Sequence, residues 1–365
     1  MQTGNISRVS TAAEDLEITG TAQREAWLAK RMPPIERLAE GVWSIPVSVP
    51  DNPIRLTYSY LLAGDEGAAV LVDPGWNTDR GWDELLTGLG RAGVALSQIS
   101  GIVITHSHPD HHGLTRRLSQ ATDAWIAMHP AEVDALPSHH DLGGGADATW
   151  LSQLGVPGAD RTTMTVDASR MADFLAMPDP TRTLDDNTYL PLPGRQIRLL
   201  WTPGHTPGHL SFHDEDNDLL LTGDHVLPRI SPNVGLHPHH AGSPLGPYLS
   251  SLRRLLPYES VEVLPAHEWR FRGLPTRVRQ LLHHHDERLA EILAVLDDEP
   301  GATTWQIAQR LTWAHGWDAI TGFQRRAALA ESAAHLDHLV ETGVLDVELD
   351  EAGVAHYRRT VAGKA

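Results

Sequence analysis

Short apolar runs separated by turn-forming residues dominate the chain after residue 38. The first three runs are rich in Val, Leu, Ile and Tyr and are bounded by Gly, Asp, Asn and Pro, which is typical of successive antiparallel strands; they cover 41–49, 55–63 and 68–75. Beyond Asp73 the pattern alternates, with a helix predicted at 82–92, a strand at 101–105, a helix after Asp110 and a strand at 124–129. This alternation predicts an α/β fold.

The second half of the chain repeats this arrangement. Strand-like runs return at 196–201, 209–213 and 218–224, and a loop rich in Pro and His leads into a helix and a last strand at 261–267. Between the halves, 131–184 holds helical patches broken by glycine and proline, so we expect a helical cover over a pocket. Its large apolar side chains could form an acyl-binding wall or belong to an ordinary core: Leu136, Trp150, Leu154, Met164, Met171, Phe174 and Met177.

Both ends of the chain differ from this main domain, which we assign to 39–274. Residues 1–38 are polar with one short helix ended by Pro33 and Pro34, and we expect an N-terminal arm. Residues 275–365 predict three helices and a β-hairpin, which indicates a small α+β domain resembling a winged helix. Such modules often contact DNA, but nine Lys and Arg oppose fourteen Asp and Glu in this segment. We therefore expect it to pack on the main domain, wall a pocket or form a homodimer contact.

Composition excludes several kinds of protein. Hydrophobic residues at 41% and charged residues at 21% are ordinary for a globular chain, and no stretch approaches the roughly 20 apolar residues that span a bilayer. The first residues lack the basic start and apolar core of a secretory signal, so we expect a cytoplasmic protein without a membrane partner. A net charge of −18 disfavours nucleic acid as a partner. The chain has no cysteine, so a metal ion would need His and carboxylate ligands.

The densest group of such residues is THSHPDHHG, which spans 105–113 and directly follows the predicted strand at 101–105. Residues two apart on an extended segment point to the same side, so His106 and His108 can reach one ion together. The turn that follows can direct Asp110 and His111 toward a second ion. The alternative is a set of polar residues that solvate a loop, but a hydrophobic strand running into three His and one Asp is more typical of a metal site.

HSHPDHHG resembles the HxHxDH motif of the metallo-β-lactamase superfamily, and the rest of that family's pattern follows in order between about Gly41 and Arg272. Asp73 matches its early Asp, His205 the next ligand, Asp224 the bridging carboxylate and His267 the last His. The resemblance implies an αββα sandwich with two divalent metal ions. It implies one ion held by His106, His108 and His205, a second held by Asp110, His111 and His267, and Asp224 between them.

The same resemblance implies a hydrolase. A water shared by the two ions would become the hydroxide nucleophile, while one ion would polarise the substrate carbonyl. Asp110 and Asp224 are the expected catalytic residues, with Asp110 orienting the hydroxide and passing its proton to the leaving group. Zinc is the expected metal, although the same ligands accept iron or manganese. We expect Asp73 to support the ligand loop and not to bind the metal directly.

Other His and Arg residues are candidates for support or for contact with a small-molecule substrate. His112 and His209 lie beside predicted ligands and are expected to pack or to support them, and His237 lies in the loop after Asp224, where it could touch substrate. Arg270 and Arg272 follow His267 and could either form ion pairs or receive an anionic part of the substrate. The run His283–His285 is expected to form a solvated helix face.

The full His and Asp set favours particular branches of the family. It is more similar to glyoxalase II-type thioesterases and acyl-homoserine lactonases than to antibiotic-destroying β-lactamases, which usually carry Cys where this chain has Asp224. We therefore expect hydrolysis of a small ester, thioester or lactone. The alternatives are a phosphodiesterase or nuclease, which the acidic charge opposes, an iron-dependent redox enzyme, a β-lactam hydrolase, and a regulator built on the C-terminal module.

Overall fold

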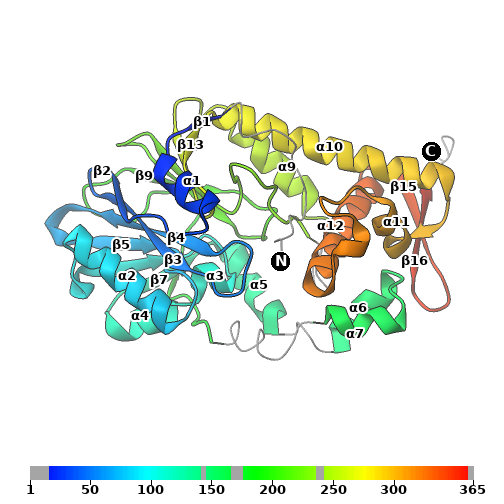
Figure 1. Cartoon of the computed structure of the whole chain (residues 1–365), viewed down its shortest axis with the longest axis horizontal. Coiled ribbons are helices and arrows are strands. Elements are labelled where there is room, and N and C mark those ends of the chain that lie inside the picture. The colour runs from blue at the N-terminus through cyan, green and yellow to red at the C-terminus, as the bar shows by residue number, and fades with distance from the viewer. Residues whose placement is uncertain (1–15, 141–144, 166–175, 236–241, 361–365) are drawn as a thin grey trace.

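Two β-sheets packed face to face form the centre of the molecule, with helices on both outer faces (Figure 1). The computed structural model describes residues 16–140, 145–165, 176–235 and 242–360, without the side chains of 137–140. Apolar side chains of both sheets meet in one core, which includes Tyr60 and Leu62 from one sheet and Leu199 and Phe212 from the other. The four layers implied by the sequence, helix, sheet, sheet and helix, are therefore confirmed.

The first sheet has seven strands in the order β2-β3-β4-β5-β6-β7-β8. Pairing is antiparallel from β2 to β5 and parallel from β5 to β8, because helices cross over between β5, β6 and β7. The strands are β2 (Glu36–Ala39), β3 (Val42–Ser48), β4 (Leu56–Ala63), β5 (Ala69–Val72), β6 (Ile99–Val103), β7 (Trp125–Met128) and β8 (Arg182–Thr183). The predicted antiparallel trio is thus confirmed as β3, β4 and β5.

The second sheet has six strands in the order β1-β13-β12-β11-β10-β9. An antiparallel trio is followed by a helix and a parallel strand, as in the first sheet, so the predicted repetition of the two halves is present. The strands are β1 (Glu17–Ile18), β9 (Ile197–Trp201), β10 (Leu210–Asp214), β11 (Leu219–Gly223), β12 (Glu262–Pro265) and β13 (Phe271–Arg272). The segment expected to be an arm contributes one strand to each sheet, β1 and β2.

Amphipathic helices cover the outer faces of the sheets. Leu85 and Leu89 of α2 (Asp79–Ala92) pack against the first sheet, and Thr78 caps this helix by accepting a hydrogen bond from the Gly81 amide at 2.9 Å. The other helices around the sandwich are α1 (Thr21–Leu28), α3 (Pro109–His112), α4 (Thr115–Ala121), α5 (Pro130–His140) and α9 (Leu245–Arg254), with 3₁₀ turns at Asp65–Gly67 and Leu96–Gln98. No helix in the described residues is long and apolar enough to cross a membrane.

The 25-residue helix α10 (Leu274–Asp298) runs from the second sheet into a separate C-terminal core (Figure 1). Two short helices that were expected to cover the pocket pack into this core, which buries Trp150, Leu154 and Met164. Of the two alternatives for these three side chains, an acyl-binding wall or an ordinary core, the structure shows the core. Met171 and Phe174 lie outside the described residues. The remaining elements are α6 (Gly145–Gln153), α7 (Gly158–Met164), β14 (Ala302–Thr303), α11 (Thr304–Arg310), the 3₁₀ turn Trp317–Ala319, α12 (Gly322–Glu341), β15 (Leu345–Leu349) and β16 (Ala355–Arg359).

The expectation that His283–His285 form a solvated face is wrong for two of the three residues. His284 is 8% exposed and His285 is 1% exposed, and His285 Nδ1 lies 3.0 Å from His335 Nε2 on α12. Only His283 of this run faces solvent, where it meets Glu287. The prediction relied on the acidic residues around the run, and the sequence did not show that α9 and α12 both cover this side of α10.

Candidate metal centre

The segment after β6 presents its polar side chains at one edge of the sandwich. Thr105 to His108 are not helical, and Pro109 begins the short helix α3, which carries Asp110 and His111. Proline fits the first position of a helix because its missing N–H has no partner there in any case. His106 and His111 are fully buried, so this edge of the sheet directs its imidazoles inward and away from solvent.

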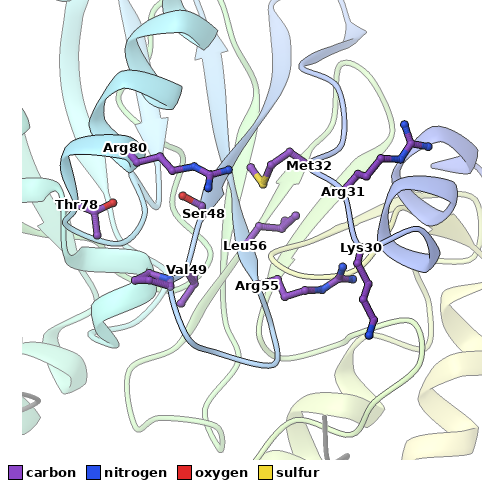
Figure 2. A pocket seen from close by; sticks show the side chains of 10 residues that line it. Lys30, Arg31, Met32, Ser48, Val49, Arg55, Leu56, Thr78 and Arg80 are labelled. Carbon is purple, nitrogen blue, oxygen red and sulfur yellow. The ribbon is translucent and has the colours of Figure 1, made fainter. Parts of the chain in front are cut away.

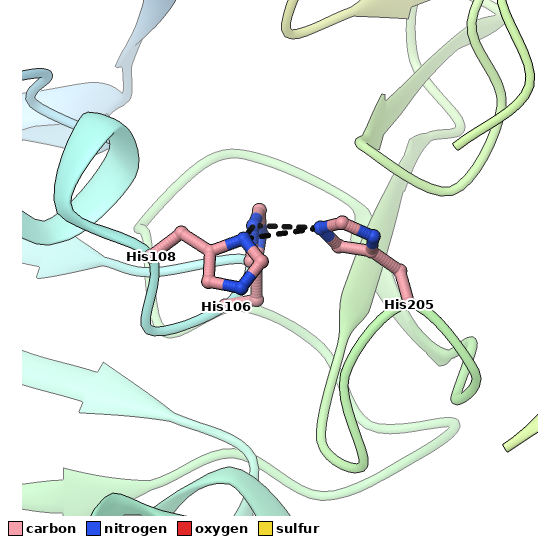
Figure 3. Close-up of side chains that lie close together, drawn as sticks. All are labelled: His106, His108 and His205. Carbon is pink, nitrogen blue, oxygen red and sulfur yellow. Dashed lines mark hydrogen bonds between the residues drawn. The ribbon is translucent and has the colours of Figure 1, made fainter. Parts of the chain in front are cut away.

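Three imidazoles converge on one point (Figure 3). His106 Nε2 lies 2.9 Å from His108 Nδ1, and His205 Nε2 lies 3.2 Å from each of these two atoms. His205 comes from the loop between β9 and β10, in the second sheet. Its contact with the motif therefore depends on the two sheets being packed together.

A second group lies beside the first. Asp110, His111 and His267 approach one another, with His267 Nε2 at 3.5 Å from Asp110 Oδ2. Asp224 lies between the groups: its Oδ1 is 3.0 Å from His267 Nε2, and its Oδ2 is 3.7 Å from His205 Nε2. The seven predicted ligands thus come together as two adjoining groups, with the Asp224 carboxylate spanning both.

The far nitrogens of these imidazoles are held by hydrogen bonds that set their tautomers. His205 Nδ1 donates to the Asn233 carbonyl at 2.7 Å, and His267 Nδ1 donates to the Leu56 carbonyl at 2.8 Å, so Nε2 of each ring keeps its lone pair. His111 Nδ1 faces Asp73 Oδ2 at 2.8 Å in the same way. This pattern is typical of metal-binding histidines, whose second nitrogen is usually fixed by a carbonyl or a carboxylate.

Atoms that point into the second group are buried without a hydrogen-bond partner. They are His111 Nε2, His267 Nε2 and Asp224 Oδ1. Buried polar atoms nearly always have a partner. These two imidazole nitrogens and the carboxylate oxygen all offer lone pairs, so a metal cation can be the partner of each of them. The donor set therefore fits a pair of divalent ions that accept nitrogen and oxygen ligands.

The local charges favour a cation as well. Burial alone would raise the pKa of the Asp224 carboxyl, but His267 and His111 hold it well below its usual range. Burial followed by the neighbouring His111 holds the pKa of His106 well below its usual range, so this ring stays neutral. Burial alone would lower the pKa of His111 and of His267, but Asp110 and Asp224 raise both, so these two rings would release a proton when a metal ion binds.

Asp73 and His209 support the centre from behind. Asp73 directly follows β5 and has a left-handed backbone (φ +53°). It accepts hydrogen bonds from the Thr105 amide at 2.8 Å and the Thr105 hydroxyl at 2.7 Å, and it also faces His111. His209 Nε2 accepts a hydrogen bond from the Asp224 amide at 3.2 Å, and its Nδ1 faces the Thr202 hydroxyl at 2.9 Å. Both contacts agree with the supporting roles that the sequence suggested.

Glu132 is a buried charged residue beside the candidate site that sequence reasoning missed. Its carboxylate is completely buried on α5 and accepts four hydrogen bonds: from the Ser107 amide (2.8 Å) and hydroxyl (2.6 Å), the Thr206 hydroxyl (2.7 Å) and the Gly208 amide (2.8 Å). Ser107 lies between His106 and His108, and Thr206 follows His205. Glu132 therefore ties together the two loops that carry the first imidazole group. The sequence could have indicated Glu132 by its position just after β7, because β7 is parallel to β6 and the two strands end at the same edge of the sheet.

The other candidate residues lie away from the two groups. His112 Nδ1 faces the Thr115 hydroxyl and its Nε2 donates to the Pro178 carbonyl, and burial lowers the pKa of His112 to about 4. Arg270 forms ion pairs with Glu262 (2.6 Å) and Glu36 (3.3 Å), and Arg272 donates to the Ser260 carbonyl. For Arg270 the ion-pair alternative is the one observed. His237 lies outside the described residues.

Comparison with known proteins identifies the family. A profile of the metallo-β-lactamase superfamily matches residues 53–267, from just before β4 to the last predicted ligand. The chain belongs to the metallo-β-lactamase superfamily. The matched segment contains all seven predicted ligands of this superfamily member, together with Asp73 and Glu132.

Similar proteins share both the sandwich and the C-terminal region of this superfamily member. A metallo-β-lactamase family protein from Thermus thermophilus superposes with a TM-score of 0.73 at 29% identity, over 89% of this chain and 100% of that one. A β-lactamase domain protein from Burkholderia ambifaria superposes with a TM-score of 0.76 at 26% identity, over 96% and 99%. The probable metallo-hydrolase YqjP of Bacillus subtilis is 27% identical over 77% of this chain and 86% of its own length.

Proposed function

We propose that this chain is a hydrolase with two metal ions that cleaves a small ester, thioester or lactone. The observation that carries the proposal is the pair of adjoining His and Asp groups joined by Asp224, in a chain of a superfamily that includes metallo-hydrolases. His106, His108 and His205 would hold one ion and Asp110, His111 and His267 the other. Zinc is the proposed metal, and iron and manganese are alternatives.

When bound, the two ions would supply Lewis-acid chemistry, which lowers the pKa of water and polarises a substrate carbonyl. The protein's own groups then have separate tasks. Asp224 would keep its negative charge between the two groups of ligands, and Asp110 would take up a proton and pass it to the leaving group. Asp73, His209 and Glu132 hold the ligand loops in register, so that little reorganisation is needed when substrate binds.

A thioester is the favoured substrate within this class. The bovine protein named acyl-coenzyme A thioesterase MBLAC2 is 32% identical over 143 residues, which cover 36% of this chain and 47% of that protein. The match covers less than half of either chain, so it supports the reaction class and leaves the acyl group open. A β-lactam, a phosphodiester and a redox substrate are the alternatives that the assay below separates.

The C-terminal region supports a second part of the proposal. The order α10, β14, α11, α12 and the hairpin β15-β16 resembles that of a winged helix, and its core includes side chains of α6 and α7. We propose that this module braces the helices beside the pocket or joins two copies of the chain, and that it does not bind nucleic acid. We also propose a cytoplasmic location.

Metal content and a substrate panel test the proposal. The purified protein should contain close to two equivalents of metal and should hydrolyse members of a panel of thioesters, aryl esters and lactones faster than β-lactams or phosphodiesters. Asp224→Ala and His108→Ala should each lose metal and reduce kcat/KM at least a thousandfold, whereas His283→Ala, an exposed histidine on α10, should match the parent protein. Full activity of metal-free protein would refute the mechanism.

A further inference from the structure

A pocket of about 530 Å³ lies between the end of α1, the β3-β4 hairpin and the start of α2 (Figure 2). Ten residues of the described chain line it; four are cationic and none is acidic. The whole chain has only 29 Lys and Arg among 365 residues and a net charge of −18. A pocket of this size suits a small-molecule group, and its charge is opposite to that of the protein as a whole.

The four cations are Lys30, Arg31, Arg55 and Arg80. Only Arg80 has a carboxylate partner among the described residues, Glu84 at 2.8 Å. Arg55 donates to the Trp27 carbonyl at 2.7 Å and lies over the Trp27 ring. Burial lowers the pKa of Arg55, and the nearby Tyr58 and Glu268 offset this effect only in part. Within the described segments, Lys30, Arg31 and Arg55 thus line the pocket without a carboxylate in ion-pair contact.

The backbone holds these cations in place. The Lys30 and Arg31 amides donate to the Trp27 and Ala26 carbonyls, which closes the end of α1, and the Val49 amide donates to the Arg55 carbonyl across the hairpin. Lys30 (φ +53°) and Arg55 (φ +67°) adopt left-handed backbone conformations that glycine adopts more easily.

Residues on two sides of the pocket are linked by hydrogen bonds to the second group of predicted ligands. The Leu56 carbonyl accepts the hydrogen bond from His267 Nδ1 at 2.8 Å. On the other side, Thr78 follows the turn at Gly75, whose amide donates to the His111 carbonyl at 3.3 Å. The pocket is therefore one layer of residues away from Asp110, His111 and His267.

We propose that this basic pocket binds the phosphorylated end of the substrate, a nucleotide-sized group that carries two or more phosphates and is joined to the acyl group cleaved at the neighbouring metal centre. The inference rests on the proposed function and adds the substrate class. Lysine and arginine bind phosphate oxygens with charge-assisted hydrogen bonds. Arg270 and Arg272, which the sequence suggested for this role, are engaged elsewhere.

Binding of a phosphorylated probe tests the pocket without any turnover. Adenosine 3′,5′-bisphosphate, titrated calorimetrically into the full chain at low salt, should bind saturably, and adenosine should not. The double variant Lys30→Gln/Arg31→Gln should weaken binding at least tenfold. The control Arg91→Gln/Arg279→Gln removes the same charge from exposed positions that form no ion pair within the described chain, and should change the affinity less than twofold.

The two proposals can fail separately. Absence of saturable binding, equal binding of adenosine, or equal weakening in both double variants would overturn the pocket assignment even if the protein hydrolyses thioesters. A protein that binds the bisphosphate but cleaves no ester would overturn the proposed function alone. With an active enzyme, Lys30→Gln/Arg31→Gln should raise KM for a thioester with a phosphorylated leaving group and leave the kinetics on a phosphate-free thioester unchanged.

Discussion

Replacing Glu132 by Gln tests how far one buried carboxylate organises the metal centre. The change preserves size and shape but replaces one of two accepting oxygens by an NH₂ group. Glu132 Oε1 faces the amide and hydroxyl of Ser107, and Oε2 faces the Thr206 hydroxyl and the Gly208 amide. Whichever way the new amide lies, its NH₂ group meets one backbone N–H, which must lose its partner.

The size of the effect follows from these four contacts. A hydroxyl can rotate to accept a hydrogen bond from the new NH₂ group, but a backbone N–H cannot. One buried N–H is left unpaired, which costs about 1–3 kcal/mol, and the remaining hydrogen bonds lose the strength that the ionised oxygen gives them. We expect a loss of about 2–4 kcal/mol in the free energy of unfolding. Because the loops of His106, His108 and His205 are then less well fixed, metal affinity should fall about 10- to 100-fold.

Denaturant unfolding of the metal-free protein measures the first quantity, and competition with a chromophoric chelator measures the second. Glu25→Gln, the same change at an exposed position on α1, is the matched control and should shift stability by less than about 0.5 kcal/mol. An E132Q protein with parental stability and parental metal affinity would show that the carboxylate does not organise the two loops. Loss of stability with unchanged metal affinity would restrict its role to packing.

Two further predictions concern the C-terminal half. Arg277 is fully buried and donates to the Leu227 carbonyl (2.6 Å) and the Ile230 carbonyl (2.8 Å). Arg277→Gln should therefore reduce the free energy of unfolding by about 2–4 kcal/mol. Arg279→Gln, at an exposed position on the same helix, is the control, and equal denaturation midpoints for the two variants would contradict the reasoning. Burial lowers the pKa of His335 to about 3 and that of His284 to about 4. Between these values and about pH 6.5 the unfolded chain binds more protons than the folded one, so stability should fall as pH falls through that window, by up to about 1.4 kcal/mol per pH unit for each residue. His335→Gln should flatten this dependence in unfolding curves recorded from pH 7 to pH 4, and an unchanged slope would rule out His335 as a contributor.

The sequence by itself determined the strands of the sandwich and the seven candidate ligands. Alternating apolar residues fix which side of a strand is buried, as in β4, where Tyr58, Tyr60 and Leu62 face the opposite sheet. His106, His108, Asp110 and His111 could be named because they follow a predicted strand at close spacing, whereas His205, Asp224 and His267 were named from the resemblance to the family's pattern. The absence of Cys and the spacing of His106, His108 and Asp110 needed no coordinates at all.

Only the tertiary structure decided which charged residues are buried and which face a pocket. A local pattern cannot show that α10 is covered by two helices at His285, or that Glu132 meets donors from two loops that lie 25 and 74 residues away along the chain. Lys30, Arg31, Arg55 and Arg80 come from three separate segments, and the pocket that they share exists because α1, the β3-β4 hairpin and α2 are brought together by the packing of the two sheets. Burial and charge clustering depend on contacts between distant residues, and the order of residues alone does not encode those distances.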